Sequence, residues 1–336
     1  MAYTTINKST DYFNTKLYTG NGSNNHTITG VGFDTDLAWI KNRGGDDHRL
    51  FDKVRGVNKF VKSNTTDAET TDAIFTTNSD GYVVTNAGEV NANNQNFVGW
   101  NWKANGAGSA NTDGSISSTV SVNTTAGFSI VSFNQASSPQ TIGHGLNSVP
   151  KIIFIKDRDS VANWQVYSES IGASNKLLLD STNASASSGV FNSTAPTSSV
   201  FTFNSNFGST IAYCFAEKTG YSKFGSYTGN GNNDGTFVYT GFKPTFVLTK
   251  IYSAADGWSL TDSVRDRAVV PNGARLLGEQ EQVEQTNQTW ALIEKFSNGF
   301  KIRGTDNVTN ASGANYIYMA FGQSIVGTNN IPATAR

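Results

Sequence analysis

The sequence predicts an all-β protein made of tandem antiparallel β-sandwich units, of the jelly-roll or lectin-like kind and three in number. Composition is the first reason: charged residues make up 15 % of the 336-residue chain, and 33 residues are glycine. Its polarity comes instead from Asn, Ser, Thr and Gly, which favour turns and weaken helices. The second reason is an internal repeat.

The repeat is seen in the pentapeptide Tyr-Thr-Gly-Asn-Gly, which occupies residues 18–22 and returns at residues 227–231. The two copies are 209 residues apart (227 minus 18), and the same spacing separates Gly32 from Gly241 and Lys41 from Lys250. A spacing held over three landmarks indicates duplication of one structural unit.

Turn signals and short apolar runs divide the chain into expected parts. Residues 36–41, for example, are an apolar run between turns, typical of a strand buried on both faces. The stretch 105–125, rich in Gly, Ser and Thr, is expected to be flexible chain or a loosely paired strand. Residues 277–285 are expected to form a solvated insertion loop or one helical turn. The predicted parts are an N-terminal arm (1–16), unit 1 (17–104), a linker (105–125), unit 2 (126–218), unit 3 (219–322) and a C-terminal tail (323–336).

Charge and cysteine content limit the partners. The formal net charge is −1, so no global field attracts nucleic acid or an anionic membrane, and neither is expected as a partner. The single cysteine, Cys214, allows no disulfide within the chain and is expected to be a core residue. No secretory signal and no apolar run of about 18 residues is evident, so synthesis in a cytoplasm is expected.

Motifs for catalysis, metals or cofactors are not evident in the sequence. The three histidines, His26, His48 and His144, have no metal-ligand partners at a suitable spacing. The repeated pentapeptide lacks the Gly-Lys-Ser/Thr of a phosphate-binding loop. We therefore expect no catalytic residue, no metal and no cofactor. A polysaccharide hydrolase needs two carboxylates set by their distance in space, and the sequence singles out no such pair.

Two charged pairs recur and are candidates for structural ion pairs. Asp52 and Arg55 are repeated as Asp262 and Arg265. Residues three apart on a strand point to opposite faces. The Asp and Arg of each pair are therefore not expected to bind each other but to pair with another charge, such as Lys41 or Lys250 on a neighbouring strand.

One tryptophan is a candidate for binding a glycan. Trp258 follows Ala-Ala-Asp-Gly, which places it on the loop side of its predicted strand, where an aromatic ring can stack on a sugar. Trp39 and Trp100 lie within strand patterns and are expected in the core.

Several motifs together resemble an uncharacterised domain that is common in structural proteins of tailed bacteriophages, marine ones especially. The resemblance is close over unit 1 and looser over unit 3, and unit 2 departs from it because it lacks the pentapeptide. The N-terminal residues 1–6 and C-terminal residues 331–336 also look like that group. The motifs in unit 1 are Tyr-Thr-Gly-Asn-Gly (18–22), Asp-Leu-Ala-Trp-Ile-Lys-Asn-Arg (36–43), Asp-Lys-Val-Arg-Gly (52–56) and Val-Gly-Trp-Asn-Trp-Lys (98–103).

The resemblance implies a non-enzymatic part of a virion, assembled in the host cytoplasm and displayed on the outside of the particle. It would decorate the capsid or form a tail-associated fibre, with major capsid or tail proteins, and further copies of itself, as partners. An attachment protein that binds a host receptor or surface glycan is the alternative. A polysaccharide depolymerase is less favoured.

Overall fold

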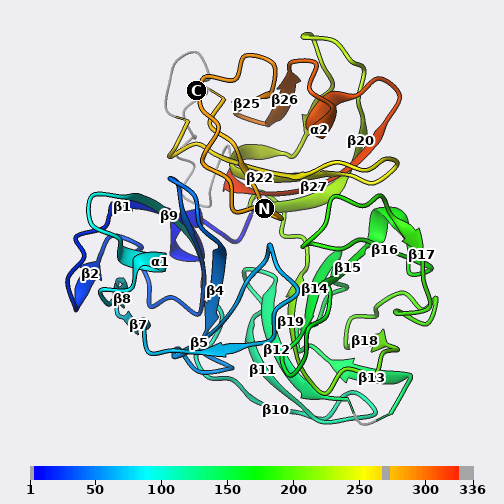
Figure 1. Ribbon diagram of the computed structural model, residues 1–336. Coiled ribbons are helices and arrows are strands. Elements are labelled where there is room, and N and C mark those ends of the chain that lie inside the picture. The colour runs from blue at the N-terminus through cyan, green and yellow to red at the C-terminus, as the bar shows by residue number, and fades with distance from the viewer. Residues whose placement is uncertain (1–3, 136, 267–272, 325–336) are drawn as a thin grey trace.

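The computed structural model describes residues 4–135, 137–266 and 273–324. These residues form strands β1 to β27, with short helical turns between some of them, and every sheet is antiparallel. The prediction of an all-β protein of sandwich type is therefore confirmed. The strands gather into three units, coloured blue to cyan, green, and yellow to red in Figure 1.

Unit 1 pairs a large sheet, in the order β1-β9-β3-β4-β5-β6, with a small sheet, β2-β8-β7. The helix α1 (Gly88–Asn91) precedes the last strand. The bounds of the strands are β1 Phe13–Thr19, β2 His26–Ile28, β3 Leu37–Asn42, β4 His48–Asp52, β5 Lys59–Val61, β6 Thr70–Thr71, β7 Phe75–Asn78, β8 Gly81–Val84 and β9 Asn96–Trp102.

Unit 2 has a large sheet in the order β10-β11-β12-β19-β14-β15 and two strand pairs, β13-β18 and β16-β17. The 3-10 turn η2 (Glu169–Ile171) follows β15. The bounds are β10 Ser109–Asn111, β11 Ser118–Asn123, β12 Phe128–Asn134, β13 Gln140–Gly143, β14 Ile152–Asp157, β15 Gln165–Ser168, β16 Asn175–Lys176, β17 Ala186–Ser187, β18 Val200–Phe203 and β19 Ser209–Phe215.

Unit 3 has a large sheet in the order β20-β27-β22-β23-β24 and a small sheet, β21-β26-β25. The helix α2 (Asn307–Asn310) precedes the last strand, as α1 does in unit 1. The bounds are β20 Ser222–Thr228, β21 Phe237–Tyr239, β22 Phe242–Ile251, β23 Trp258–Asp262, β24 Leu276–Leu277, β25 Leu292–Phe296, β26 Gly299–Arg303 and β27 Asn315–Ser324.

The three large sheets share one topology. In each, the first strand of the repeated pattern pairs with the strand that closes the unit, and the closing strand pairs in turn with a strand that is fully buried in units 1 and 2 and mostly buried in unit 3. The order β1-β9-β3-β4 is thus repeated as β12-β19-β14-β15 and as β20-β27-β22-β23. Unit 2 is therefore a copy of the same pattern, although it lacks the pentapeptide.

Two predicted boundaries are wrong. The segment 105–125 is not a linker of flexible chain but has the alternative form, a paired strand, because β10 and β11 extend the large sheet of unit 2, and β11 pairs with β12 along its whole length. Its alternation of small polar residues with Val120, which is buried, suits a strand as well as a linker. The predicted arm is also shorter, since β1 already begins at Phe13 and η1 spans Ser9–Asp11. Of the predicted tail, residues 325–336 lie outside the described residues.

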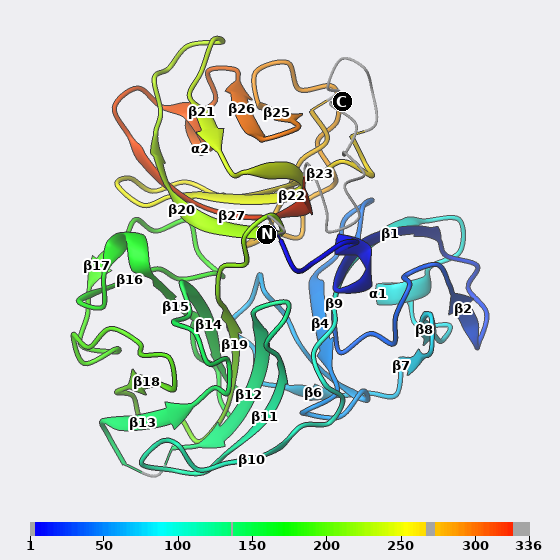
Figure 2. The ribbon, with the colours of Figure 1, turned by 180° about the vertical axis from the view of Figure 1, so that it is seen from behind.

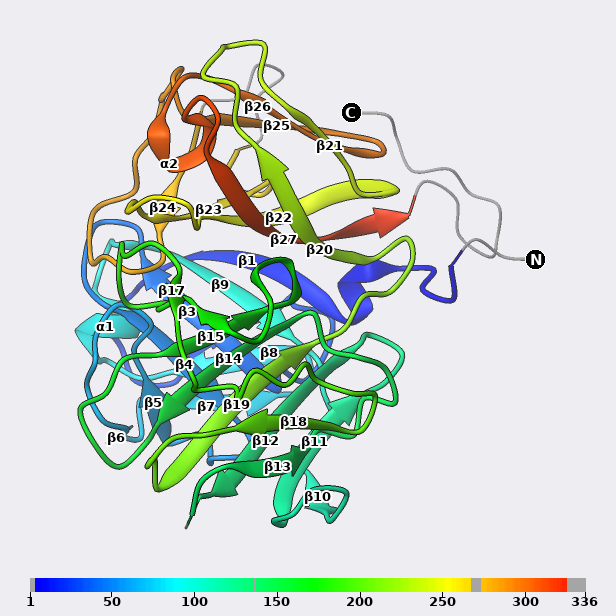
Figure 3. The same cartoon turned by 90° about the vertical axis from the view of Figure 1, so that its right-hand side faces the viewer.

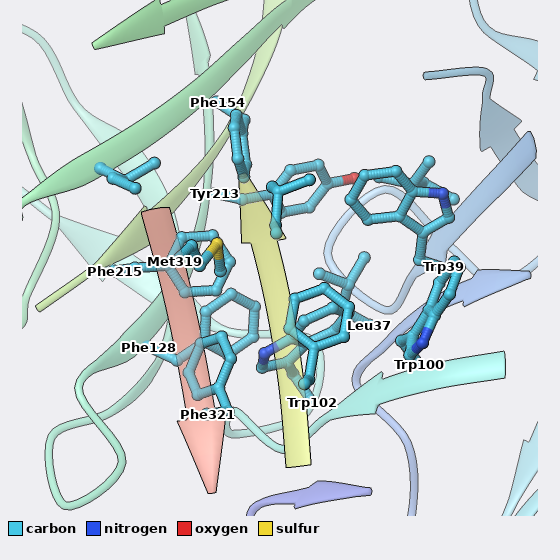
Figure 4. Close-up of a cluster of buried hydrophobic side chains, with 14 of the residues drawn as sticks. Leu37, Trp39, Trp100, Trp102, Phe128, Phe154, Tyr213, Phe215, Met319 and Phe321 are labelled. Atoms are coloured by element: carbon cyan, nitrogen blue, oxygen red, sulfur yellow. The ribbon is translucent and has the colours of Figure 1, made fainter. Parts of the chain in front are cut away.

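The central strands of each large sheet are buried on both faces. Along β19, Ile211, Tyr213 and Phe215 face a central core, whereas Ala212 and Cys214 face a core inside unit 2. The closing strands of the other two units alternate in the same way. Every unit therefore has its own sandwich core, and all three contribute one face to the central core in Figure 4.

Three equivalent aromatic residues meet in the central core. Trp102 pairs across its sheet with Leu37, Phe215 with Ile152, and Phe321 with Phe246. The centroids of the rings of Trp102, Phe215 and Phe321 are separated pairwise by 5.9, 6.0 and 6.1 Å. The units are thus related by an approximate threefold axis through these rings. They close around a common centre, as Figures 2 and 3 also show, and are not stacked in series.

Candidate functional site

Three buried lysines tie the units together. Lys41, Lys156 and Lys250 occupy equivalent positions on β3, β14 and β22, and each Nζ donates to backbone carbonyl groups. One of those carbonyl groups always belongs to another unit: Glu281 at 3.0 Å, Thr66 at 3.1 Å and Thr182 at 3.0 Å, respectively. Burial is the main cause that lowers the pKa of all three amines to about 8.

The recurring Asp and Arg residues form ion pairs, but with each other. Arg55 Nε lies 2.5 Å from Asp52, and Arg265 Nε lies 2.6 Å from Asp262. The expected pairing with Lys41 or Lys250 is wrong. Asp52 ends β4 and Asp262 ends β23, and the turn that follows brings each arginine back beside its aspartate, so strand alternation does not apply.

Both arginines reach a glutamate that also binds an arginine of another unit. Glu69 accepts from Arg55 at 3.2 Å and from Arg158 of unit 2 at 2.8 Å. In unit 3, Glu284 takes the corresponding place: it accepts from Arg265 at 3.0 Å and from Arg43 of unit 1. Glu284 lies in the segment 277–285 that was expected to be solvated, so that prediction is wrong for this residue.

The boundary between units 2 and 3 differs from the other two. At the other two boundaries, the backbone N–H of the glutamate donates to the backbone carbonyl of the arginine: Glu69 to Arg158 O, and Glu284 to Arg43 O. Here the backbone N–H of Ser185 donates to Tyr252 O at 2.9 Å in the same way. Ser185 and Tyr252 carry no charge, so this boundary keeps the backbone bond and lacks the ion pair. Unit 2 also lacks the aspartate of the ion pair. Ser168 pairs with Ile152 at the position where Asp262 pairs with Phe246 in unit 3, so Ser168 is the equivalent residue.

Trp258 is not a glycan-stacking residue. Only 1 % of its surface is exposed, and its indole N–H donates to Leu178 O of unit 2 at 2.9 Å. Trp164 makes the equivalent bond to Lys62 O of unit 1 at 2.7 Å. The residues before Trp258 form a loop, but Trp258 itself opens β23 and faces the central core, where a different unit covers it.

His48 is the residue of unit 1 that corresponds to Trp164 and Trp258. Its Nε2 lies 3.0 Å from Leu277 O of unit 3, and its Nδ1 accepts the indole N–H of Trp39 at 2.8 Å. Burial first, and the charge of Lys41 second, lower the pKa of His48 well below its ordinary value. His48 is therefore a neutral structural residue. Cys214 is buried as predicted, and burial raises the pKa of its thiol.

The most distinctive exposed feature is on unit 3. Phe237 and Tyr239 are 44 % and 58 % exposed on β21, while Val238 between them is buried. The ring of Phe237 lies against Gly299 and 6.1 Å from the ring of Phe296. We call Phe237, Tyr239 and Phe296 the aromatic face. Figure 3 shows that its sheet lies on the side of unit 3 away from the other units.

Paired charges border the aromatic face. Asp234 accepts from Lys301 at 2.5 Å and from Arg303 at 3.0 Å, and Arg303 also binds Glu294 at 2.9 Å. Two positive and two negative groups leave this border without net charge. An exposed aromatic surface with a polar border is typical of a binding surface.

The corresponding face of unit 1 carries no aromatic residue. Val238 pairs with Phe300 as Ile28 pairs with Tyr82, so Thr27 and Thr29 correspond to Phe237 and Tyr239. Likewise Asn78, opposite Gly81, corresponds to Phe296, opposite Gly299. The fold accepts Thr, Thr and Asn at these positions, so packing of the unit does not require the three aromatic side chains.

Two polar grooves lie beside the equivalent arginines of units 1 and 2. One, of about 360 Å³, is lined by Arg158 with hydroxyl-bearing residues of β11 and β12, and the other, of about 250 Å³, by Arg43 and Glu284. Within the described ranges, no three or more His, Cys, Asp or Glu residues are grouped so as to hold a metal ion. No helix in the described part of the chain has the length and apolar character to cross a membrane.

A family model described as a domain of unknown function, DUF7483, matches residues 8–324. The chain belongs to this family. The match runs through all three units, including unit 2, so the DUF7483 domain corresponds to the whole closed assembly and not to one repeat. A comparison with curated proteins finds no match.

Proposed function

We propose that this DUF7483 protein is a non-enzymatic structural part of a tailed-phage virion, displayed on the particle as a capsid decoration or as part of a tail fibre. The proposal starts from the motifs of unit 1 that resemble phage structural proteins. Major capsid or tail proteins would be its partners.

The observation that carries the proposal is the closure of three sandwich units around one core. Such an arrangement buries both faces of the central strands of every large sheet, and local opening of a unit would expose central aromatic residues such as Trp102. Proteins on a particle released from a cell benefit from this resistance to opening, because they are no longer maintained by chaperones.

The buried polar groups support the same reading. The three lysines and the two arginine clusters are all engaged in bonds within and between units. Charged groups that are buried and paired in this way hold one arrangement of the units in preference to others. Their role in the proposal is therefore to fix the shape of the particle component.

The alternative of a glycan-binding attachment protein loses the residue on which it rested, because Trp258 is buried. The depolymerase alternative rested on no particular residues. Neither is supported as strongly as a structural role.

The test is to locate the protein on purified particles. Antibody labelling and cryo-electron microscopy of the phage that encodes the chain are expected to place it on the head or the tail, in a number of copies set by the symmetry there. Its absence from purified particles by mass spectrometry would contradict the proposal. Release of reducing ends from host polysaccharide by the purified protein would favour the depolymerase instead.

A further inference from the structure

We propose that unit 3 associates with a second copy of this chain through the free edge of β21, with the aromatic face lying across the joint. This inference concerns the contact between two copies, and it does not depend on where the protein is located.

The first observation is that no described strand pairs with the outer edge of β21. Thr240 donates its N–H to Asn298, and Thr236 accepts from Ile302. In an antiparallel ladder the positions alternate, so the backbone groups of Phe237 and Tyr239 point away from β26. Across the described residues, β21 pairs with β26 alone. Exposed edges of this kind readily accept another strand.

The second observation is that unit 2 covers the same edge. Ile142 corresponds to Val238, since each is buried and pairs with the equivalent phenylalanine, Phe201 or Phe300. Ile116 forms a parallel bridge to Ile142. This edge of the repeat is therefore able to accept an added segment.

The hydrogen bonds in unit 2 identify which backbone groups an added segment satisfies. Ser115 Oγ accepts from the N–H of Thr141 at 2.9 Å, and Ser118 Oγ donates to Gly143 O at 2.9 Å. Thr141 and Gly143 correspond to Phe237 and Tyr239 of unit 3. The same groups are thus bonded in unit 2, whereas in unit 3 they have no hydrogen-bond partner in the part of the chain that the structure describes.

The third observation is that β21 is complementary to itself. If two copies of β21 pair antiparallel about a twofold axis at Val238, then Phe237 lies opposite Tyr239 of the second copy, and Tyr239 opposite Phe237. Both are positions whose backbone groups point outward, so the facing residues exchange their hydrogen bonds. Their rings lie on one face, where cross-strand aromatic pairs are favourable.

The chemistry of the face favours a protein strand over a sugar. Phe237 and Phe296 have no polar group to bond with a sugar hydroxyl, whereas aromatic residues bordered by Arg are typical of protein interfaces. The border of Asp234, Glu294, Lys301 and Arg303 has no net charge, so two copies do not repel each other there. A twofold contact of this kind uses the same surface on both copies.

Analytical ultracentrifugation of the full chain, over about three orders of magnitude in concentration, tests the proposal. The wild-type chain is expected to show a reversible monomer–dimer equilibrium. The double variant Phe237→Thr/Tyr239→Thr, which takes its residues from unit 1, is expected to fold normally and to weaken dimerisation at least about tenfold. Trp290→Ala, which removes an exposed aromatic residue outside the aromatic face, is the matched control and should dimerise like the wild type.

Two outcomes overturn the proposal: a wild-type chain that stays monomeric throughout, or a double variant that dimerises as tightly as the wild type. A monomeric chain that binds neutral oligosaccharides through Phe237 and Tyr239 would assign the face to a sugar instead. Hydrogen exchange gives an independent reading, because the amides of Phe237 and Tyr239 should exchange more slowly at dimer-forming concentrations.

Discussion

At three equivalent positions, a ring of one unit is bonded to a backbone carbonyl group of the next. Trp164 and Trp258 use an indole N–H, and His48 uses an imidazole nitrogen. Only the histidine can be protonated at moderate pH. Protonation keeps the bond from Nε2–H to Leu277 O but adds a proton to Nδ1, which then no longer accepts from the indole N–H of Trp39. This position therefore depends on pH in unit 1 and not in units 2 and 3.

His48 is predicted to make the protein less stable in mild acid. Its pKa is lowered in the folded chain, so below about pH 6.5 the unfolded chain binds a proton that the folded chain does not, and stability falls with pH. The loss is up to about 1.4 kcal/mol per pH unit, and His144 adds to it in the same direction. Urea unfolding at pH 7 and pH 5 should show a smaller loss for His48→Gln than for the wild type. An equal loss in both proteins would contradict this account.

The three inter-unit lysines are predicted to titrate together near pH 8. Each pKa falls from 10.5 to about 8 on folding, so from pH 8 to 10 the unfolded chain holds more protons and the free energy of unfolding rises. Buried tyrosines such as Tyr82 oppose this only above pH 10, because their pKa is raised. NMR of ¹³C-labelled lysine should show three midpoints near pH 8, with one lost in Lys156→Met. Midpoints near 10.5 for all three would exclude this environment.

At the scale of elements, the turns after β4 and β23 explain one success and one error of the sequence analysis. The repeat of Asp and Arg correctly indicated ion pairs shared by units 1 and 3. Their partners were missed because strand alternation was applied beyond the end of each strand. The glutamates that complete the clusters come from loops, where the sequence gives no period from which to infer direction.

Removing one charge of the buried pair Asp262–Arg265 is predicted to destabilise the protein more than removing both charges. Asp262→Ser leaves buried Arg265 without its nearest partner and should cost about 3–5 kcal/mol. The double variant Asp262→Ser/Arg265→Ile copies Ser168 and Ile171 of unit 2 and removes the buried charge, so it should cost less. Urea unfolding compares the two. A double variant less stable than the single variant would show that the unpaired charge of Arg265 is not the main cause of the destabilisation.

At the scale of the molecule, the sequence predicted the class of fold and the number of units, because both depend on local patterns and on a fixed spacing. It did not predict closure around a common core. Trp258 and Trp164 are covered by residues of a different unit, Leu178 and Lys62, and no local pattern reports such contacts. The aromatic face was missed for another reason: Phe237 and Tyr239 have the alternation of any half-buried strand, and only comparison with Thr27 and Thr29 shows that they are unusual.

Trp102 at the centre is predicted to be the most sensitive core position. Trp102→Ala removes a buried ring that contacts Phe215 and Phe321, and should cost about 3–5 kcal/mol. Trp102→Phe copies the residue that the other two units have there, and it also removes an indole N–H that has no partner among the described residues. It should therefore cost much less in thermal or urea unfolding. Equal costs would argue against a tightly packed centre.

The central claim is that the three units form one structure around a shared core. Differential scanning calorimetry of the full chain tests this most directly. The account predicts one transition whose calorimetric and van't Hoff enthalpies agree, because no unit keeps its large sheet covered without the other two. Two or three separate transitions would show that the units are independent domains, and would contradict the claim.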